Sequence, residues 1–203
     1  MTLDSSTGVI SGNLTEEFVG DIQIQISCEG CESVTITLSF TLHNYQETEN
    51  NLTADDSNPN YTVSQNTTYS NSSSYSAWKA MDGNTTTYSK TAYSSGQYGW
   101  WQIDFHQPVF LGGFTLTCDN GSSYGTYLEA SEDGTTWTRI DSTKIPDNTT
   151  TTREYKFTTP YQYYRFINET SYYYVQFYEI KFLYQYAENI IIVDNQSINQ
   201  NYQ

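Results

Sequence analysis

The segment Asp82-Gly83-Asn84, followed by Thr87, combines residue types that bind a hard cation. Calcium takes about six to eight oxygen ligands at roughly 2.3–2.6 Å. Asp82 offers a carboxylate, Thr87 offers a hydroxyl and a carbonyl, and Gly83 allows a tight turn that aims several carbonyls at one point. The residues alone favour a plain Asp-Gly-Asn turn, with a calcium-binding loop as the alternative.

Tyrosine is unusually frequent, with 20 in 203 residues, and much of it falls in polar segments that read as loops. A tyrosine offers a ring face for stacking on a sugar and a hydroxyl for hydrogen bonding. The expected loops are 71–75, 89–99, 118–127 and 168–174. The candidate ligand-binding residues are Tyr75, Tyr93, Tyr98, Tyr124, Tyr172 and Tyr173. For each of them, packing against a neighbouring loop is the alternative.

The sequence contains no HExxH, GxSxG, P-loop or GxGxxG motif. Its two histidines, His43 and His106, lie at the end of an expected strand and in an expected turn. A glycosidase needs only two carboxylates, and the 23 acidic residues offer many pairs, but none lies in a recognisable catalytic motif. We therefore expect no catalytic residues and no enzymatic activity.

The three cysteines are Cys28, Cys31 and Cys118, and an odd count excludes complete internal pairing. The first two have CxxC spacing, but no second CxxC accompanies them to complete a zinc site. We expect a local disulfide or free thiols.

The charge balance narrows the class of ligand. With 8 basic and 23 acidic residues the net charge is −15, spread along the chain. Such a surface repels nucleic acids and anionic membranes, and leaves neutral ligands and cations open.

Ten N-x-Ser/Thr sequons favour a glycosylated protein outside the cell or on its surface. An Asn- and Thr-rich composition alone is the other explanation. The sequons lie at Asn13, Asn51, Asn60, Asn66, Asn71, Asn84, Asn120, Asn148, Asn168 and Asn195.

Alternation of apolar and polar residues predicts an all-β protein with no convincing helix. Two strands are expected at 22–26 and 34–42, and the turn between them contains the CxxC. Asp133-Gly134 predicts a hairpin. The further strands are expected at 101–105, 109–118, 127–130, 137–140, 153–157, 163–168 and 175–184.

Composition divides the chain into four parts. Residues 1–45 hold the first two strands, and residues 46–60 are polar and predict a linker. Residues 61–186 form the main domain, with the spacing of short antiparallel strands that is typical of a sandwich or jelly roll. Residues 187–203 predict a loose tail.

The main domain, over about 61–186, resembles the discoidin or coagulation factor 5/8 type C family, which includes the family 32 carbohydrate-binding modules. Residues 80–87 read Ala-Met-Asp-Gly-Asn-Thr-Thr-Thr, against Ala-x-Asp-Gly-Asn-x-x-Thr in the family. Four more motifs follow in the family's order: Trp100–Phe105 (WWQIDF), Ser131–Trp137 (SEDGTTW), Tyr163–Phe166 (YYRF) and Tyr178–Phe182 (YEIKF). Each motif alone is weak, and their common order makes the resemblance specific.

The resemblance implies a discoidin-type β-sandwich that binds a ligand without catalysis. It implies a structural calcium ion held by the carbonyl of Ala80 and by Asp82, Asn84, Thr87 and Glu179. Trp100 and Trp137 are expected in the core, and Arg165 is expected to support a strand. Two departures concern the ligand site: Ser89 stands where family members often have Trp, and the candidate loops contain no Arg or His.

The first part of the chain carries a second resemblance. Residues Leu3–Gly12 fit the pattern Leu-x-x-x-Thr-Gly-x-Ile-x-Gly, and two alternating strands follow. This is similar to the closing half of an Ig-like (cadherin-like) repeat of surface proteins. Half a repeat would leave open strand edges that have to be covered.

Together these features predict a non-catalytic, calcium-stabilised, lectin-like module of a secreted or cell-surface protein, which binds glycans or glycoproteins. The main alternative is an adhesive domain that binds a protein partner or self-associates through the N-terminal strands. Binding to a membrane surface is a weaker third reading, because the candidate loops are polar and contain Lys90 as their one base.

Overall fold

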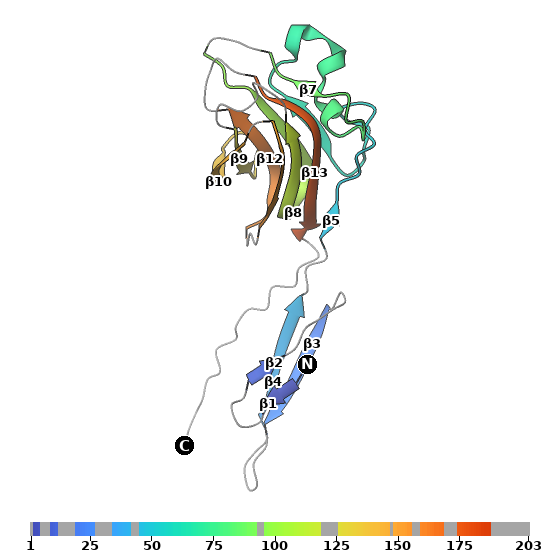
Figure 1. Ribbon diagram of the computed structural model, residues 1–203. Helices are drawn as coiled ribbons and strands as arrows, with labels where there is room; N and C mark the ends of the chain where they lie inside the picture. Colours follow the sequence, from blue (N-terminus) through green and yellow to red (C-terminus); the bar gives the residue numbers. More distant parts are fainter. Residues whose placement is uncertain are drawn as a thin grey trace. The chain divides into compact units, whose positions relative to one another are not determined.

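The computed structural model divides the chain into two compact units, one of Met1–Asn44 with Glu188–Gln203 and one of Tyr45–Ala187 (Figure 1). In the first unit the backbone is described for residues 2–4, 9–11, 19–26 and 34–41. In the second unit backbone and side chains are described for residues 45–92, 96–118, 126–146, 148–155, 159–168 and 174–187.

Two antiparallel pairs make up the described backbone of the first unit. β1 (Thr2–Asp4) pairs with β2 (Val9–Ser11), and β3 (Val19–Ile26) pairs with β4 (Val34–Thr41). The second pair confirms the two strands that alternation predicts. Cys28 and Cys31 lie outside the described residues.

A single long strand, β8 (Trp100–Cys118), belongs to both layers of the second unit. Its first half pairs with β6 (Thr62–Gln65) and β12 (Tyr161–Asn168). Its second half pairs with β11 (Thr150–Glu154) and β13 (Gln176–Tyr186). The sequence predicts two strands here. They are one strand that passes through His106, whose φ of 61° interrupts the regular extension.

Shorter strands extend the two layers. β9 (Thr126–Ser131) pairs with β12, and β10 (Thr138–Ile145) pairs with β9 across the Asp133-Gly134 turn, which confirms the predicted hairpin. β5 (Gln46–Glu47) and β7 (Ser89–Lys90) both pair with β13. Sequence analysis missed β5, β6 and β7, because strands this short carry too few residues to show an alternation.

Aromatic side chains fill the space between the layers. Trp101 is 0% exposed, and its ring stacks on that of Phe182 with centroids 6.1 Å apart and planes at 14°. The expectation that Trp100 and Trp137 are core residues is wrong, because both are only half-buried. Along β8 the alternation turns Trp101 inward and its neighbour Trp100 outward.

The segment between β6 and β7 forms three 3₁₀ helices, η1 (Tyr69–Asn71), η2 (Ser73–Tyr75) and η3 (Ala77–Ala80). The indole N–H of Trp101 donates a buried hydrogen bond of 3.0 Å to the carbonyl of Ala77 and so ties η3 to the core. The described residues form no α-helix, and none of their helices is long and apolar enough to cross a membrane.

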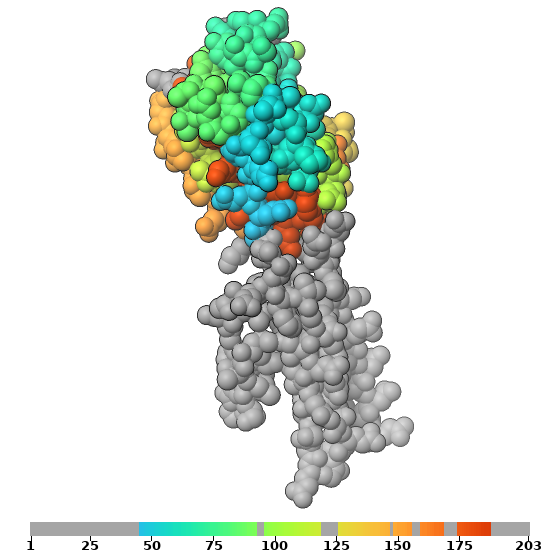
Figure 2. All heavy atoms as spheres, turned by 90° about the vertical axis from the view of Figure 1, so that its right-hand side faces the viewer, coloured from blue at the N-terminus to red at the C-terminus, as the bar shows by residue number. Residues whose placement is uncertain are grey.

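Residues 46–60 do not form the expected linker. β5 pairs with β13, the amide of Thr48 donates to the carbonyl of Phe182, and Leu52 is 2% exposed. In Figure 2 these residues, at the blue end of the coloured chain, lie directly on the red residues of β13. Backbone hydrogen bonds and the buried side chain of Leu52 hold this polar segment to the sheet. Composition alone does not reveal these contacts. The tail predicted at 187–203 lies outside the described residues beyond Ala187.

Arg153 connects the edge strands of the two layers. Its guanidinium donates to the carboxylate of Asp141 and to the carbonyls of Thr143 and Lys144, at 2.7 and 2.8 Å for the carbonyls. The hydroxyl of Tyr155 donates to the same carboxylate at 2.6 Å. Burial would raise the pKa of Asp141, but these hydrogen bonds and the Arg153 charge hold it below its usual value. The contact between β10 and β11 is thus made by the side chain of Arg153.

The Trp101 hydrogen bond leads to the first prediction. Trp101→Phe keeps an aromatic ring but removes the donor, which leaves the buried carbonyl of Ala77 without a partner and opens a small cavity. We expect the free energy of unfolding to fall by about 2 kcal/mol, measured by urea denaturation followed by circular dichroism. Trp100→Phe, at the half-buried neighbour, is the matched control. An equal loss in both variants would contradict the role given to the buried donor.

Candidate functional site

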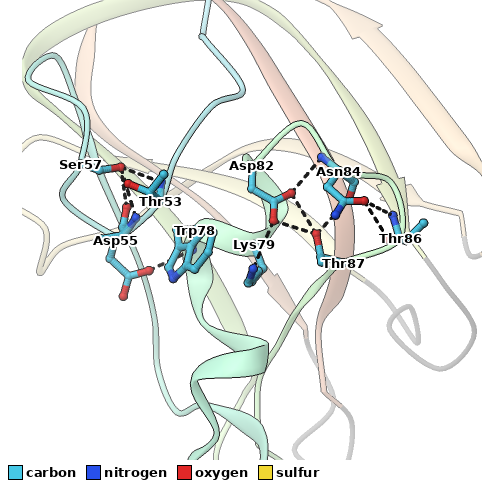
Figure 3. Close-up of polar contacts among 10 residues, drawn as sticks. Thr53, Asp55, Ser57, Trp78, Lys79, Asp82, Asn84, Thr86 and Thr87 are labelled. Carbon is cyan, nitrogen blue, oxygen red and sulfur yellow. Dashed lines mark hydrogen bonds and ion pairs between the residues drawn. The ribbon is translucent and has the colours of Figure 1, made fainter.

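The predicted cation loop begins directly after η3 (Figure 3). The side chains of Asp82 and Thr87 meet in it, whereas the side-chain oxygen of Asn84 accepts from the amide and hydroxyl of Thr86. The carboxylate of Asp82 accepts from the amide of Asn84 at 2.9 Å and from the hydroxyl of Thr87 at 2.7 and 2.9 Å. The ammonium of Lys79 lies 3.5 Å from the same carboxylate. Gly83 has a φ of 74°, which confirms that the turn needs the left-handed region.

The loop is held from the segment that was expected to be a linker. Asp55 accepts from the amide of Trp78 at 2.9 Å and so fixes the start of η3. Asn50 lies against Gly83 so closely that an added Cβ would stand 2.6 Å from the Asn50 carbonyl oxygen. The side-chain amide of Asn50 donates to Glu179 on β13 and to the carbonyl of Ile180 at 2.9 Å.

Glu179 joins the loop from β13, 97 positions after Asp82 in the sequence. Burial raises the pKa of Glu179, and the charge of Asp82 raises it further, while the hydrogen bond from Asn50 and the nearby backbone amides of Gly83 and Asn84 lower it. Among the described residues, neither Oδ1 of Asn50 nor Oε1 of Glu179 has a hydrogen-bond donor, although both atoms are buried. Buried acceptors without donors cost free energy, and a hard cation would satisfy them.

The donor set fits calcium better than a transition metal. No group of three or more His, Cys, Asp or Glu side chains gathers in the parts of the chain that the structure describes. Any ion here would therefore rely on two carboxylates and on amide, hydroxyl and carbonyl oxygens, which are hard ligands. Ala80 is fully buried two residues before Asp82. Sequence analysis missed Asn50, because nothing in the polar segment 46–60 distinguishes it.

The candidate ligand tyrosines fall into three groups. Tyr75 packs in a row of rings, 5.5 Å from Tyr69 and 5.4 Å from Tyr88 between centroids, as the packing alternative describes. Tyr98 is 50% exposed and is the most open large apolar side chain among the described residues. The other four candidates, Tyr93, Tyr124, Tyr172 and Tyr173, lie outside the described residues.

The candidate loops are attached to neighbouring ends of β8, β9 and β12, at one end of these paired strands, here called the sheet edge. Ile167 pairs with Trp100, and Asn168 pairs with Thr126. The amide of Asn168 donates to the carbonyl of Gly99 at 2.9 Å. Three of the candidate loops therefore have one end at neighbouring positions. They are 89–99, which leads into β8, 118–127, which leads into β9, and 168–174, which follows β12.

A shallow depression of about 510 Å³ lies on the outer sheet face beside this edge. Its polar lining is a set of three charged side chains in register: Glu129 on β9 stands between Arg139 on β10 and Arg165 on β12. Nε and Nη2 of Arg165 donate to one carboxylate oxygen of Glu129 at 2.9 and 2.7 Å, and Nη2 of Arg139 lies 3.4 Å from the other. The remaining lining residues are Tyr98, Ile167 and Asn168.

Aromatic rings support both arginines from the sheet. The guanidinium carbon of Arg165 lies 3.9 Å from the ring centroid of Trp137, and that of Arg139 lies 4.2 Å from the ring centroid of Tyr127. Arg165 supports the strands as expected, but it also lines the depression, which sequence analysis missed. The search for bases was confined to loops, whereas these arginines lie on strands at outward-facing positions of the alternation.

The F5/8 type C family model described as "NedA-like, galactose-binding domain" matches residues 79–166. No curated protein matches the chain. None of the matches named here is to an Ig-like repeat, so the Ig-like interpretation of residues 1–45 stays a prediction.

Three solved structures share the fold at low sequence identity. An F-lectin (fucolectin) from striped bass (Morone saxatilis) serum has a TM-score of 0.55 and 17% identity over 70% of this chain and 49% of its own. A CBM32 from Clostridium perfringens, in complex with GalNAc-β-1,3-galactose, has a TM-score of 0.51 and 17% identity over 61% of this chain and 94% of its own. An F5/8 type C domain from Bacteroides fragilis has a TM-score of 0.50 and 24% identity over 62% of this chain and 91% of its own.

The chain thus spans about half the length of the striped-bass lectin and nearly all of the two bacterial domains. The matched segment contains the Asp82 loop, the whole of β8, the β9–β10 hairpin and the Tyr-Tyr-Arg-Phe sequence of β12, in that order. Residues 79–166 of the second unit are therefore similar to the F5/8 type C family, and the unit has the β-sandwich fold of these proteins.

Proposed function

We propose that the unit Tyr45–Ala187 is a non-catalytic carbohydrate-binding module that binds a glycan at the sheet edge where the tyrosine-bearing loops meet. The observation that carries the proposal is the depression beside this edge, which joins the exposed ring of Tyr98 to fixed polar side chains. Sugars are bound by such combinations, because an aromatic face covers the apolar side of the ring while fixed donors and acceptors meet the hydroxyls.

Calcium belongs to the same proposal as a structural ion. The ion would be held by Asp82, Asn84, Thr87, Glu179 and the carbonyl of Ala80. Oδ1 of Asn50, which is buried without a hydrogen-bond partner, would be a further oxygen ligand. The ion would supply positive charge between two carboxylates that otherwise repel each other. It would join the Asp82 loop to β13 and to the segment 46–60, and so keep three distant parts of the chain in one arrangement.

A location outside the cell or on its surface fits the exposed sequons. Five sequon asparagines are exposed: Asn51, Asn60, Asn71, Asn84 and Asn148. Asn168 is different, because its side chain is 0% exposed at the end of β12 and cannot carry a glycan in the folded unit. We propose that glycosylation, where it occurs, uses the exposed positions other than Asn84, which belongs to the proposed calcium site.

Self-association through the first unit is a second candidate. In the described backbone, β1–β2 and β3–β4 are each two-stranded sheets. Two strands alone are marginally stable, and each leaves backbone donors and acceptors that a strand of another chain can pair with. Sizing of the whole chain against a variant without residues 1–44 tests this, since only the whole chain would then form oligomers.

Tyr98→Ala tests the sugar site. Loss of a stacking ring at an exposed site lowers affinity without harming the fold, and we expect affinity for a galactose-containing glycan to fall by about tenfold or more. Titration calorimetry with GalNAc-β-1,3-galactose measures it. Tyr69→Ala is the matched control, because Tyr69 is the other large apolar side chain left exposed by the described residues, at 39%. If the folded wild-type protein binds nothing on a glycan array, either in calcium or in EDTA, the proposal that this unit binds carbohydrate is wrong.

Glu179→Gln tests the calcium site. Calcium that binds only the folded state stabilises it by about 2.7 kcal/mol at about 100 times its Kd, so the wild-type Tm should fall by several degrees when EDTA replaces calcium. The variant keeps the shape of the side chain but loses its charge, and we expect most of the calcium-dependent shift to disappear. Glu132→Gln, on an exposed turn, should keep the full shift. Equal calcium responses in both variants would exclude Glu179 as a ligand.

A further inference from the structure

Lys79 places a positive charge at the loop that is proposed to bind calcium. Its ammonium lies 3.5 Å from Oδ2 of Asp82, and Figure 3 shows the two side chains facing each other. The same carboxylate accepts from the hydroxyl of Thr87, a second proposed ligand. A calcium ion bound to Asp82 would therefore share this carboxylate with a cation that belongs to the chain.

The ammonium of Lys79 is held beside the carboxylate by more than the ion pair. Nζ of Lys79 lies 3.8 Å from the ring centroid of Trp78, so the indole covers one side of the charge. The side chain of Lys79 is 20% exposed, and that of Asp82 is 8% exposed. Water and salt screen charges in such a place less than they screen charges on an open surface.

The backbone that carries Lys79 is fixed to the rest of the unit. Asp55 accepts from the amide of Trp78 at 2.9 Å, and the buried indole of Trp101 donates to the carbonyl of Ala77 at 3.0 Å. Lys79 lies on the same short helix, η3, three positions before Asp82. The core therefore fixes the backbone from which both members of the ion pair extend.

Lys79 changes the charge that an ion would meet in the loop. When Asp82 and Glu179 are both ionised, they bring two negative charges to the proposed site, and Lys79 offsets one of them. The affinity of an oxygen site for calcium depends on how many of its ligands are charged and on how rigid the site is. A lysine ammonium next to a ligand therefore lowers the affinity, because it repels the incoming cation and competes for the same carboxylate.

We propose that Lys79 lowers the calcium affinity of the Asp82 loop into the range of calcium sites that work outside the cell. Such sites bind calcium with Kd values of about 0.1–1 mM, whereas sensors inside the cell bind it at about 10 μM or below. The site would then fill outside the cell and stay unloaded in a cytosol. This rests on the proposed function, because it concerns the affinity of the calcium site proposed there.

An ion pair that only stabilises the turn is the alternative. Pairs between neighbouring turns of a helix contribute little to stability when they are exposed. In that case Lys79 would act on the folding of the loop and leave the affinity for the ion unchanged. The two explanations therefore differ in the calcium affinity of variants at this position.

Titration calorimetry of the whole chain with calcium chloride measures that affinity. We expect a Kd of about 0.1–1 mM for the wild type and about tenfold tighter binding for Lys79→Met, which keeps a long apolar side chain but removes its charge. Lys79→Arg keeps the charge and should bind calcium within about twofold of the wild type. The rise in Tm caused by a fixed calcium concentration should be larger in Lys79→Met than in the wild type.

Lys144→Met is the matched control. It removes one positive charge from an exposed position on β10, which β9, β12 and β8 separate from β13 in the sheet. Its Kd for calcium should stay within about twofold of the wild type, because a charge at that distance is screened. Circular dichroism checks that each variant is folded.

The outcomes separate this inference from the proposed function. Equal Kd values for the wild type and Lys79→Met overturn the inference and leave calcium binding intact. A gain in affinity as large in Lys79→Arg or Lys144→Met also overturns it, because the gain would not depend on the charge at this position. Binding by Lys79→Met alone supports the inference but excludes calcium as a ligand of the wild-type chain. If neither protein binds calcium at about 10 mM, the inference and the proposed calcium site are both wrong.

Discussion

The buried hydrogen bond from the indole of Trp101 to the carbonyl of Ala77 is the contact on which much of the second unit depends. Trp101 stands at the centre of the aromatic core, stacked on Phe182 of β13, so the donor cannot move without repacking both layers. Because the bond ends on η3, it holds the start of the Asp82 loop at a set place on the sandwich. The candidate cation site therefore inherits its position from the core, and Asn50 and Glu179 close it from two other parts of the chain.

The register of β9 with β10 and β12 fixes the positions of the charged side chains in the depression. Glu129 faces Arg165 in one neighbouring strand and Arg139 in the other, and all three side chains lie on the outer face. A shift of one residue would turn Arg165 into the core and Phe166 outward, which the aromatic packing forbids. The geometry of a surface depression is thus determined by apolar residues that never touch a ligand.

Both candidate sites bring charged side chains together from distant parts of the chain. At the Asp82 loop, the carboxylates of Asp82 and Glu179 lie close enough for the charge of Asp82 to raise the pKa of Glu179. Lys79 lies 3.5 Å from Asp82, while Oδ1 of Asn50 and Oε1 of Glu179 are buried without a hydrogen-bond donor among the described residues. In the depression, Arg139 and Arg165 flank the carboxylate of Glu129 from the two neighbouring strands.

The sequence by itself determined the fold class, most of the strands, the Asp133-Gly134 hairpin and, through ordered motifs, the resemblance of the second unit to the F5/8 type C family. It also placed Asp82, Asn84 and Thr87 in one loop, because residues this close in sequence need only a turn to meet. It did not reveal that residues 46–60 pack on β13, that Asn50 reaches Glu179, or that Arg139 and Arg165 flank Glu129. Those arrangements join strands that lie far apart along the chain, and their partners follow from sheet order and register, which local composition does not encode. Only the tertiary structure decided which tyrosine is open, Tyr98, and which is packed among other rings, Tyr75, because exposure depends on what the rest of the chain leaves uncovered.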